Sequence, residues 1–400
     1  MTWTELDWHA LDRLREKFLH GGAAAGPYWD SPEDLANYDL TYGERIGWKW
    51  DHVLRELRLR GWRPKSREVF DWGCGSGVAG RRVIDYFGSE NFDSLIVWDH
   101  SPLATDYAAE AARERFPNLR VSEATSGYLR SDSPVGLLVI SHVLNELPPE
   151  ALAALRTVIA RAEAMIWVEP GTHTISRQLG RMRDELRGQF RQDDIILTNS
   201  GGTTSVSSAA RTEAGPPKMT PCRFRIVAPC THELGCPMFA EGNERHWCHF
   251  FAPPPSEIFA DSNWVKFGQR AGIDLRSLPY AFVAMEKTVA ADCDRRPEGY
   301  DAPAVAAVYD RRPEGNDAAI GGHRPPLQGD WSRVIGRVEH FKPYARWLNC
   351  DAAGLHELEL PKRVDPALFK QLERTKMPLV YRWRREEKKV LAGEAIGESS

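Results

Sequence analysis

A glycine-rich stretch preceded by an acid is the part of this sequence whose residue types and spacing point most directly to chemistry. It reads Asp-Trp-Gly-Cys-Gly-Ser-Gly over residues 71–77, between a strand-like run at 67–70 and a segment at 78–87 whose apolar residues recur at helical spacing. This order predicts a strand, a tight turn and a helix. Because glycine lets the backbone turn sharply and a helix amino terminus attracts nucleotide-like groups, the stretch predicts a cofactor site.

The spacing of the glycines separates two kinds of cofactor. They stand at 73, 75 and 77, which differs from the Gly-x-Gly-x-x-Gly pattern of dinucleotide folds. The stretch resembles the first motif of class I methyltransferases, which implies S-adenosylmethionine, with Asp71 near its methionine amino end. A second apolar run ends in Asp99, whose carboxylate is expected to accept hydrogen bonds from ribose hydroxyls. The alternative is a glycine-rich turn of another α/β protein.

Residues 67–172 alternate strand-like and helix-like segments, the pattern of a parallel sheet in a Rossmann-like α/β fold. We expect strands at 67–71, 94–99, 119–122, 136–141 and 164–169, with helices at 78–87, 102–115 and 149–162. The carboxyl ends of parallel strands meet at one edge, where such sheets bind ligands. The expected cofactor-binding residues at that edge are Asp71, Gly73, Gly75, Gly77, Asp99, Ser141 and Glu169.

Catalytic side chains are expected in the segment after the fourth strand, residues 141–146. Enzymes that methylate amino groups of bases often carry Asn-Pro-Pro-aromatic here, and this chain does not. Carbon-5 methylation of pyrimidines needs a cysteine nucleophile, and no cysteine follows the fourth or fifth strand, while Cys74 reads as a packing residue. His142, Asn145 and Glu146 are candidates for orienting a base, with helix capping or cofactor contact as the alternative role.

A second stretch carries metal-ligand chemistry. Cys230, Cys236 and Cys248, flanked by prolines and a glycine, supply three corners of a tetrahedral sulfur site. Zinc accepts mixtures of cysteine and histidine, whereas an iron–sulfur cluster usually takes four thiolates. The candidates for a fourth ligand are Cys222, Cys350, His232, His246 and His249. The alternative is a group of cysteines that hold no metal.

Four short motifs together resemble one family. They are Ala-Pro-Cys-Thr-His-Glu-Leu-Gly-Cys-Pro at 228–237, Trp-Cys-His-Phe at 247–250, Leu-Asn-Glu-Leu at 144–147 and Val-Glu-Pro-Gly-Thr at 168–172. Over about 40–290 and 331–390 the chain resembles the methyltransferase-like small-ribosomal-subunit family of bacteria and mitochondria. The resemblance implies a methyltransferase fold that acts on, or binds, the rRNA of the small ribosomal subunit during ribosome assembly or translation.

The same resemblance implies a [4Fe-4S] cluster held by four cysteines. Three map onto Cys230, Cys236 and Cys248, and Cys350 fits the fourth place. The interval from Cys236 to Cys248 is longer than the family pattern, which leaves zinc, or Cys222 as a ligand, open. If Cys350 is a ligand, the metal joins the carboxyl-terminal module to the methyltransferase domain, because metal binding and folding then share their free energy.

Changes in composition divide the chain into four parts. The repeat Asp-Arg-Arg-Pro-Glu-Gly at 294–299 and 310–315 lies in a region rich in proline, glycine and charge, which predicts a dispensable disordered insertion. The expected parts are an amino-terminal helical segment at 1–65, a methyltransferase-like domain at 66–290 with a cysteine cluster at 222–250, the insertion at 291–328 and a small β module with a basic tail at 329–390.

Composition restricts partners and location. The net charge of −4 excludes a strong overall attraction to nucleic acid, yet residues 361–390 hold ten Lys or Arg against four acids, either an RNA-facing surface or a solvated face. No signal peptide or membrane span is recognisable, and seven cysteines, an odd number, fit a reducing compartment. We therefore expect a cytoplasmic protein, monomeric off the ribosome and without membrane partners.

Three functional hypotheses follow. The first is an S-adenosylmethionine-dependent rRNA methyltransferase. The second is a catalytically inactive assembly factor that keeps the fold and an iron–sulfur or zinc site. The third is a small-molecule methyltransferase with a zinc site, which salt-dependent binding to small-subunit RNA would exclude.

Overall fold

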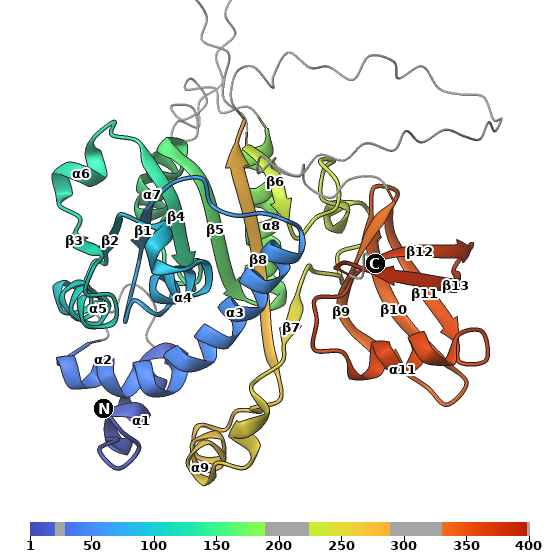
Figure 1. Cartoon of the computed structure of the whole chain (residues 1–400), viewed down its shortest axis with the longest axis horizontal. Coiled ribbons are helices and arrows are strands. Elements are labelled where there is room, and N and C mark those ends of the chain that lie inside the picture. Colours follow the sequence, from blue (N-terminus) through green and yellow to red (C-terminus); the bar gives the residue numbers. More distant parts are fainter. Residues whose placement is uncertain (21–28, 189–223, 289–329, 398–400) are drawn as a thin grey trace, which may run out of the picture.

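A mixed β-sheet with helices on both faces lies beside a small β-barrel (Figure 1). The structure is a computed structural model, and it describes residues 1–20, 29–188, 224–288 and 330–397. Cys222 and the repeat at 294–315 lie outside the described residues. Within the described ranges, none of the helices has the length and apolar character needed to cross a membrane.

The central sheet has the strand order β3-β2-β1-β4-β5-β8-β6, and β7 pairs with β8 outside this path. Strands β1 to β5 pair in parallel, whereas β8 is antiparallel to β5, β6 and β7. The bounds are β1 (Glu68–Trp72), β2 (Ser94–Trp98), β3 (Arg120–Glu123), β4 (Val135–Ser141), β5 (Ala162–Pro170), β6 (Phe224–Ala228), β7 (Phe250–Ala252) and β8 (Leu278–Lys287). The expected five-stranded parallel sheet is confirmed. Its strand order reverses between β1 and β4, the place where sheets of this kind bind ligands.

Helices cover both faces of the sheet because successive side chains of each strand point to opposite faces. In β1, Val69 belongs to one buried apolar cluster and Phe70 to the other. The first cluster also receives α4 (Val78–Phe87) and α5 (Pro102–Arg115), and the second receives α7 (Pro149–Arg161) and α8 (His173–Arg187). Two further helices, α6 (Ser126–Arg130) and α9 (Ser262–Ala271), lie at the periphery of the sheet (Figure 1).

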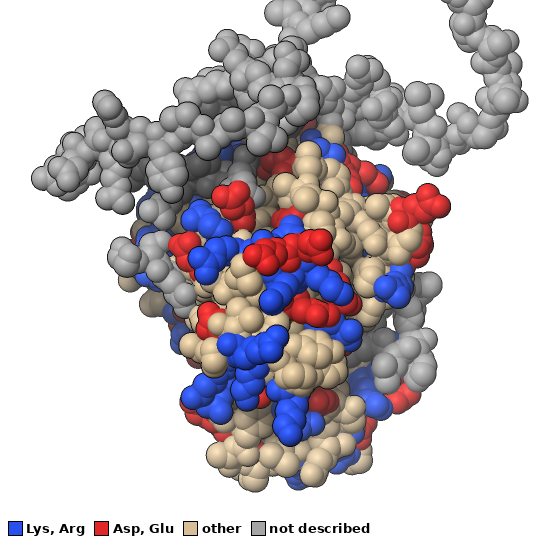
Figure 2. Space-filling view, turned by 90° about the vertical axis from the view of Figure 1, so that its right-hand side faces the viewer, with Lys and Arg blue, Asp and Glu red and all other residues tan. Residues whose placement is uncertain are grey.

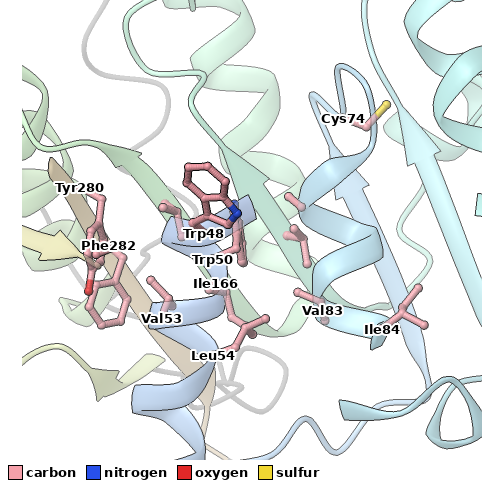
Figure 3. Packing of buried hydrophobic residues seen from close by; sticks show 14 of the residues in the cluster. Trp48, Trp50, Val53, Leu54, Cys74, Val83, Ile84, Ile166, Tyr280 and Phe282 are labelled. Carbon is pink, nitrogen blue, oxygen red and sulfur yellow. The ribbon is translucent and has the colours of Figure 1, made fainter. Parts of the chain in front are cut away.

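Three amino-terminal helices cover the first face: α1 (Trp8–His20), α2 (Pro32–Tyr38) and α3 (Glu44–Leu59). A single π-helical turn, Asp39–Gly43, joins α2 to α3. α3 crosses the sheet and buries Trp50, Val53 and Leu54 completely. Figure 3 shows these side chains beside Ile166 of β5, with Tyr280 and Phe282 of β8 close by. Burial of so large an apolar face fixes α3 next to the carboxyl edge of the sheet.

The carboxyl-terminal strands close into a five-stranded barrel in the order β10-β11-β13-β12-β9. Their bounds are β9 (Trp331–His340), β10 (Tyr344–Asp351), β11 (Gly354–Pro361), β12 (Val380–Glu386) and β13 (Lys389–Ala395), and α11 (Pro366–Arg374) lies between β11 and β12. The barrel has its own apolar core, which includes Trp347, Leu358 and Tyr381. The small β module expected from the sequence is therefore present.

Candidate functional site

The glycine loop between β1 and α4 adopts backbone conformations that side chains disfavour. Gly73, Gly75 and Gly77 have φ of 68°, 51° and 77°. A Cβ on Gly73 would lie 2.9 Å from Val143, and one on Gly77 would lie 2.8 Å from Ala108, so both positions are crowded. A Cβ on Gly75 would meet no atom within 4 Å, because this residue faces open space. The glycines therefore bring bare backbone to the edge of a cavity.

Asp99, directly after β2, holds the loop in place from the neighbouring strand. Its carboxylate accepts hydrogen bonds from the Gly75 amide at 3.0 Å and the Ser101 amide at 2.9 Å. The ring of His100 lies 3.1 Å from the same carboxylate, which raises the pKa of His100. Asp99 lines the cavity, so a carboxylate stands where the sequence predicts one for ribose hydroxyls.

The cavity beyond this edge has a volume of about 290 Å³. Its wall is strongly aromatic: Trp72 and Trp98 pack with ring centroids 5.0 Å apart, and Trp29 meets Tyr38 edge to face at 5.1 Å. Flat apolar walls and a few polar groups at one edge suit a purine nucleoside. The lining residues are Trp29, Tyr38, Ile46, Trp72, Gly73, Cys74, Gly75, Ser76, Val78, Trp98, Asp99, His100, Ser141, His142, Val143, Glu146, Leu147, Pro148 and Ala151.

Two of the predicted carboxylates lie beneath the cavity and do not line it. Asp71 is fully buried and accepts a hydrogen bond from the Gly80 amide in α4 at 2.9 Å, and burial raises its pKa to about 7. Glu169, also fully buried, accepts bonds from the amides of Val143 and Leu144 at 3.0 and 3.1 Å, and burial raises its pKa to about 7. Asp71 thus supports the first turn of α4, and Glu169 supports the segment after β4.

A chain of polar contacts runs behind the cavity wall at the end of β4. His142 lines the cavity with a φ of 56°, a left-handed conformation that costs a non-glycine residue about 1–3 kcal/mol. Its Nδ1 lies 3.1 Å from Ser141 Oγ, which accepts a hydrogen bond from Trp50 Nε1 at 3.0 Å. Its Nε2 lies 3.1 Å from Lys49 Nζ. Strained backbone held by a polar network is typical of a functional position.

Both basic groups of this contact have a depressed pKa. Burial lowers the pKa of Lys49 to about 7, the nearby charge of Arg45 lowers it further, and Glu169 opposes the shift. Burial and the neighbouring Lys49 also hold the pKa of His142 well below its ordinary value. At neutral pH His142 is therefore neutral and Lys49 is about half protonated, and the neutral fraction of Lys49 has a lone pair that can accept a proton.

The remaining candidate site residues differ in whether they line the cavity. Glu146 lines the cavity, whereas Asn145 is exposed and does not. Cys74 lines the cavity as well, but burial holds its thiol pKa well above the ordinary value, so it stays protonated. Lys49 and the aromatic wall, especially Trp29, are site residues that the sequence did not reveal. Spacing along the chain gives no signal for Lys49, because only the packing of α3 brings it to the end of β4.

Four cysteine thiols converge where the barrel meets the sheet. Cys230 follows β6, Cys236 and Cys248 lie in the connection to β7, and Cys350 lies on β10 of the barrel. Burial raises the pKa of Cys236, Cys248 and Cys350, and the electrostatic influence of Cys230 adds to each of these shifts. Cys350 Sγ is 3.8 Å from Nε2 of His232.

Buried arginines surround these thiols. Arg60 donates to the carbonyls of Val227, Pro229 and Cys230, and Arg183 donates to the carbonyls of His232 and Leu234. Both side chains are almost completely buried, as is that of Arg333 on β9. The carboxylates of Glu56 and Asp184 pair with these arginines. Three guanidinium groups against two carboxylates leave a net positive charge beside the thiols, which favours an anionic occupant.

The thiols do not form a ready-made metal site. Within the part of the chain that the structure describes, no three His, Cys, Asp or Glu side chains are arranged to hold a metal ion. His249 stacks on Trp247 with ring centroids 4.5 Å apart, and its Nδ1 lies 3.0 Å from the Trp247 carbonyl. His246 accepts a hydrogen bond from Arg245. Both histidines are thus engaged elsewhere, whereas His232 touches Cys350.

Comparison with protein-family models gives no match, and neither does comparison with curated proteins. Among solved structures, a SAM-dependent methyltransferase from Aquifex aeolicus is 16% identical over 36% of this chain and 74% of that chain, with a TM-score of 0.27. Magnesium protoporphyrin IX methyltransferase from Synechocystis PCC 6803, with bound SAH, is 16% identical over 45% and 76%, with a TM-score of 0.27. The 16S rRNA methylase RmtB is 16% identical over 44% and 66%, also with a TM-score of 0.27. The strand order itself, with β8 antiparallel, is the order of the class I methyltransferase fold.

Proposed function

We propose that this protein binds S-adenosylmethionine in the cavity at the carboxyl edge of the sheet and acts on rRNA of the small ribosomal subunit. The observation that carries the proposal is the glycine loop, in which Gly75 faces open space while Asp99 holds its amide. The loop offers backbone, the aromatic wall offers a surface for adenine, and Asp99 offers a carboxylate for the ribose. We choose rRNA as the substrate because the sequence motifs resemble those of the ribosomal family.

The residues around the cavity suit a nucleophile that loses a proton on methylation. Transfer from a sulfonium needs chiefly that nucleophile and methyl group be held in line. Bound S-adenosylmethionine supplies the methyl group. His142 faces the cavity with Lys49 behind it, and when Lys49 is neutral this pair can accept the proton that an amine or hydroxyl releases. A covalent cysteine mechanism is not supported, because the Cys74 thiol stays protonated.

Calorimetric titration with S-adenosylmethionine and S-adenosylhomocysteine tests the cofactor site. We expect saturable one-to-one binding by the wild type and binding about tenfold weaker or worse in Asp99→Asn, because hydrogen bonds to a charged group are lost. Asp93→Asn is the matched control, since Asp93 is exposed and pairs with Arg67 at the far end of the sheet. Equal binding by Asp99→Asn and Asp93→Asn would place the cofactor elsewhere. Transfer of labelled methyl to small ribosomal subunits then tests the reaction.

We further propose that Cys230, Cys236, Cys248 and Cys350 hold a [4Fe-4S] cluster, with zinc as the alternative metal. The support is the position of the four cysteines where the barrel meets the sheet, beside a net positive array of buried arginines, because a metal bound by four thiolates is anionic. Iron, sulfide and zinc analysis after anaerobic purification, on wild type and Cys350→Ser, tests the proposal. About four irons per chain, lost in the variant, support the cluster; zinc alone indicates the alternative, and no metal refutes both. Cys74→Ser is the control.

A second candidate function is an assembly factor without methyl transfer. It is favoured by the absence of an Asn-Pro-Pro-aromatic motif after β4, where this chain has Ser141, His142 and Val143. Cofactor binding and RNA binding without methyl transfer to the small subunit would establish it.

A further inference from the structure

The barrel has the connectivity of a nucleic-acid-binding fold. β9, β10 and β11 form an antiparallel meander, α11 follows, and β12 and β13 close the barrel through a parallel contact between β11 and β13. Five strands in this order, with a helix between the third and fourth, make the OB-fold. OB-folds bind oligonucleotides across their second and third strands and through the loop between the first and second.

In this protein the usual binding face is partly covered. Leu348 and Cys350 on β10 and Leu355 on β11 pack against the large apolar cluster of the sheet. The exposed remainder of that face carries Arg346, which pairs with Glu339 at 2.9 Å and approaches Glu357 at 4.0 Å. One half of this face is covered by the sheet and the other half carries two acidic side chains, so little of the face is available to RNA. The loop between β9 and β10 and the carboxyl-terminal half of β9, beyond the residues that pair with β12, remain available.

A cleft of about 280 Å³ lies along this half of β9, between the barrel and the sheet. Four cations line it, Arg276, Arg333, Arg337 and Lys376, against one acid, Glu373. Arg276 is itself paired with a neighbouring aspartate at 3.0 Å. The remaining three come from β9 and from the connection after α11, so the cleft exists only when the barrel is docked on the sheet.

Two of these arginines are held by aromatic rings. The guanidinium of Arg333 lies 4.0 Å from the ring centre of Phe250, and that of Arg337 lies 4.1 Å from the ring centre of Phe251. Arg333 is 3% exposed and forms an ion pair with Glu56 at 2.9 Å, but its Nε and Nη1 have no hydrogen-bond partner among the described residues. Buried donors without partners are costly, and Arg333 places its positive charge beneath the cleft, where it attracts a phosphate group.

An exposed aromatic pair stands at the end of the cleft. Phe341 directly follows His340, a cleft residue, and stacks on Tyr344 with ring centroids 4.8 Å apart. Phe341 is 39% exposed although it is a large apolar side chain. The exposed cations around the same loop are Lys342, Lys362 and Arg363. Figure 2, which looks onto the barrel, shows Lys and Arg side chains gathered on the lower half of this face, at the height of α11 in Figure 1.

We propose that the cleft between β9 and the sheet binds the phosphodiester backbone of a single RNA strand, and that Phe341 stacks on one of its bases. A positive groove that ends in an exposed aromatic ring is the arrangement by which OB-folds hold single strands. The inference rests on the proposed function, since it takes RNA as the partner, and it names the surface that holds the strand. It places RNA on the barrel side of the molecule, away from the cofactor cavity.

Fluorescence anisotropy with a fluorescein-labelled 12-nucleotide single-stranded RNA tests the site on the full chain. The cleft variant is Arg337→Gln with Lys376→Gln, and Phe341→Ala is examined separately. The matched control, Arg113→Gln with Arg115→Gln, removes the same charge from exposed positions on α5. We expect about tenfold weaker binding in each site variant, and a salt slope lower by about 1.4 in the cleft variant, because two phosphate contacts are lost. The control should change affinity less than twofold.

The outcomes separate this inference from the proposed function. If wild type binds RNA and the cleft and control variants weaken it equally, the cleft assignment is wrong while RNA remains the partner. If wild type binds no RNA, the proposed partner fails and the inference fails with it. Titration with inorganic phosphate forms the second arm: saturable phosphate binding that the cleft variant loses, with RNA affinity unchanged, would identify a site for a free anion and overturn the RNA assignment.

Discussion

Replacing Lys49 by methionine should stabilise the protein near neutral pH. The pKa of Lys49 falls from its ordinary 10.5 to about 7, and one unit corresponds to about 1.4 kcal/mol, so complete burial would cost about 5 kcal/mol. Because the side chain is only half-buried, solvent reduces the cost, and we expect Lys49→Met to gain about 1–3 kcal/mol at pH 6–7. Methionine keeps the length of the side chain and removes the charge.

The sign of the pH dependence gives a sharper test. Between pH 7 and 10.5 the unfolded chain binds the Lys49 proton more tightly than the folded chain, so stability of the wild type rises with pH in this window. Above pH 10.5 lysine is neutral in both states, and the advantage of Lys49→Met should vanish. Urea unfolding at pH 6, 8 and 10.5 measures the difference, with the exposed Lys65→Met as control. A difference that stays constant from pH 6 to 10.5 would show that burial does not neutralise Lys49.

Three further variants test the supports of the cavity. Gly73→Ala should lower stability by about 1–3 kcal/mol and abolish cofactor binding, because the φ of Gly73 is 68° and a Cβ there would lie 2.9 Å from a side chain. Gly75→Ala should lose less stability, because a Cβ there meets no atom within 4 Å. Thermal unfolding with and without S-adenosylhomocysteine distinguishes the two variants. Glu169→Ala leaves two buried amides without acceptors and should cost about 2–4 kcal/mol, and Glu169→Gln should recover most of it, as differential scanning calorimetry would show. Glu56→Gln removes the carboxylate shared by two buried arginines and should lower the free energy of unfolding by about 3–5 kcal/mol. The exposed Asp93→Asn should lower it by less than about 1 kcal/mol. Equal losses of stability in urea unfolding would refute the role of the buried ion pairs.

Local patterns in the sequence were sufficient to predict the parallel part of the sheet. Strands β1, β2, β4 and β5 are mainly apolar, and α4 and α7 have an amphipathic repeat, so period and order together predict the layers. The polar β3, Arg-Val-Ser-Glu, is predicted chiefly by its place in the alternation of strands and helices. The glycines at 73, 75 and 77 predicted the tight loop directly, because a backbone with positive φ at these positions favours glycine. Asp99 followed from its place after β2.

Other features depend on packing between distant segments, which spacing does not encode. Lys49 reaches the end of β4 only because α3 buries Trp50 against the sheet. The closed barrel order also depends on β11 meeting β13, a parallel contact that no local pattern indicates. Asp71 and Glu169 were expected at the ligand, yet each satisfies backbone amides below the cavity, because a strand-end carboxylate serves equally well as a ligand group or as a cap.

The cysteines and the proposed RNA cleft both lie where the barrel meets the sheet, so a change that moves the barrel affects both. Arg333 and Cys350 are paired neighbours on β9 and β10 and therefore point to the same face of the barrel. Arg333 reaches Glu56 of α3 and lines the cleft, while Cys350 reaches His232, in the cysteine-bearing connection to β7. A change that detaches the barrel at the thiols must also withdraw Arg333 from the cleft. If Cys350 is a metal ligand, as we propose, its loss should therefore weaken RNA binding even though no cysteine lines the cleft, whereas the cleft variant Arg337→Gln with Lys376→Gln should leave any bound metal in place.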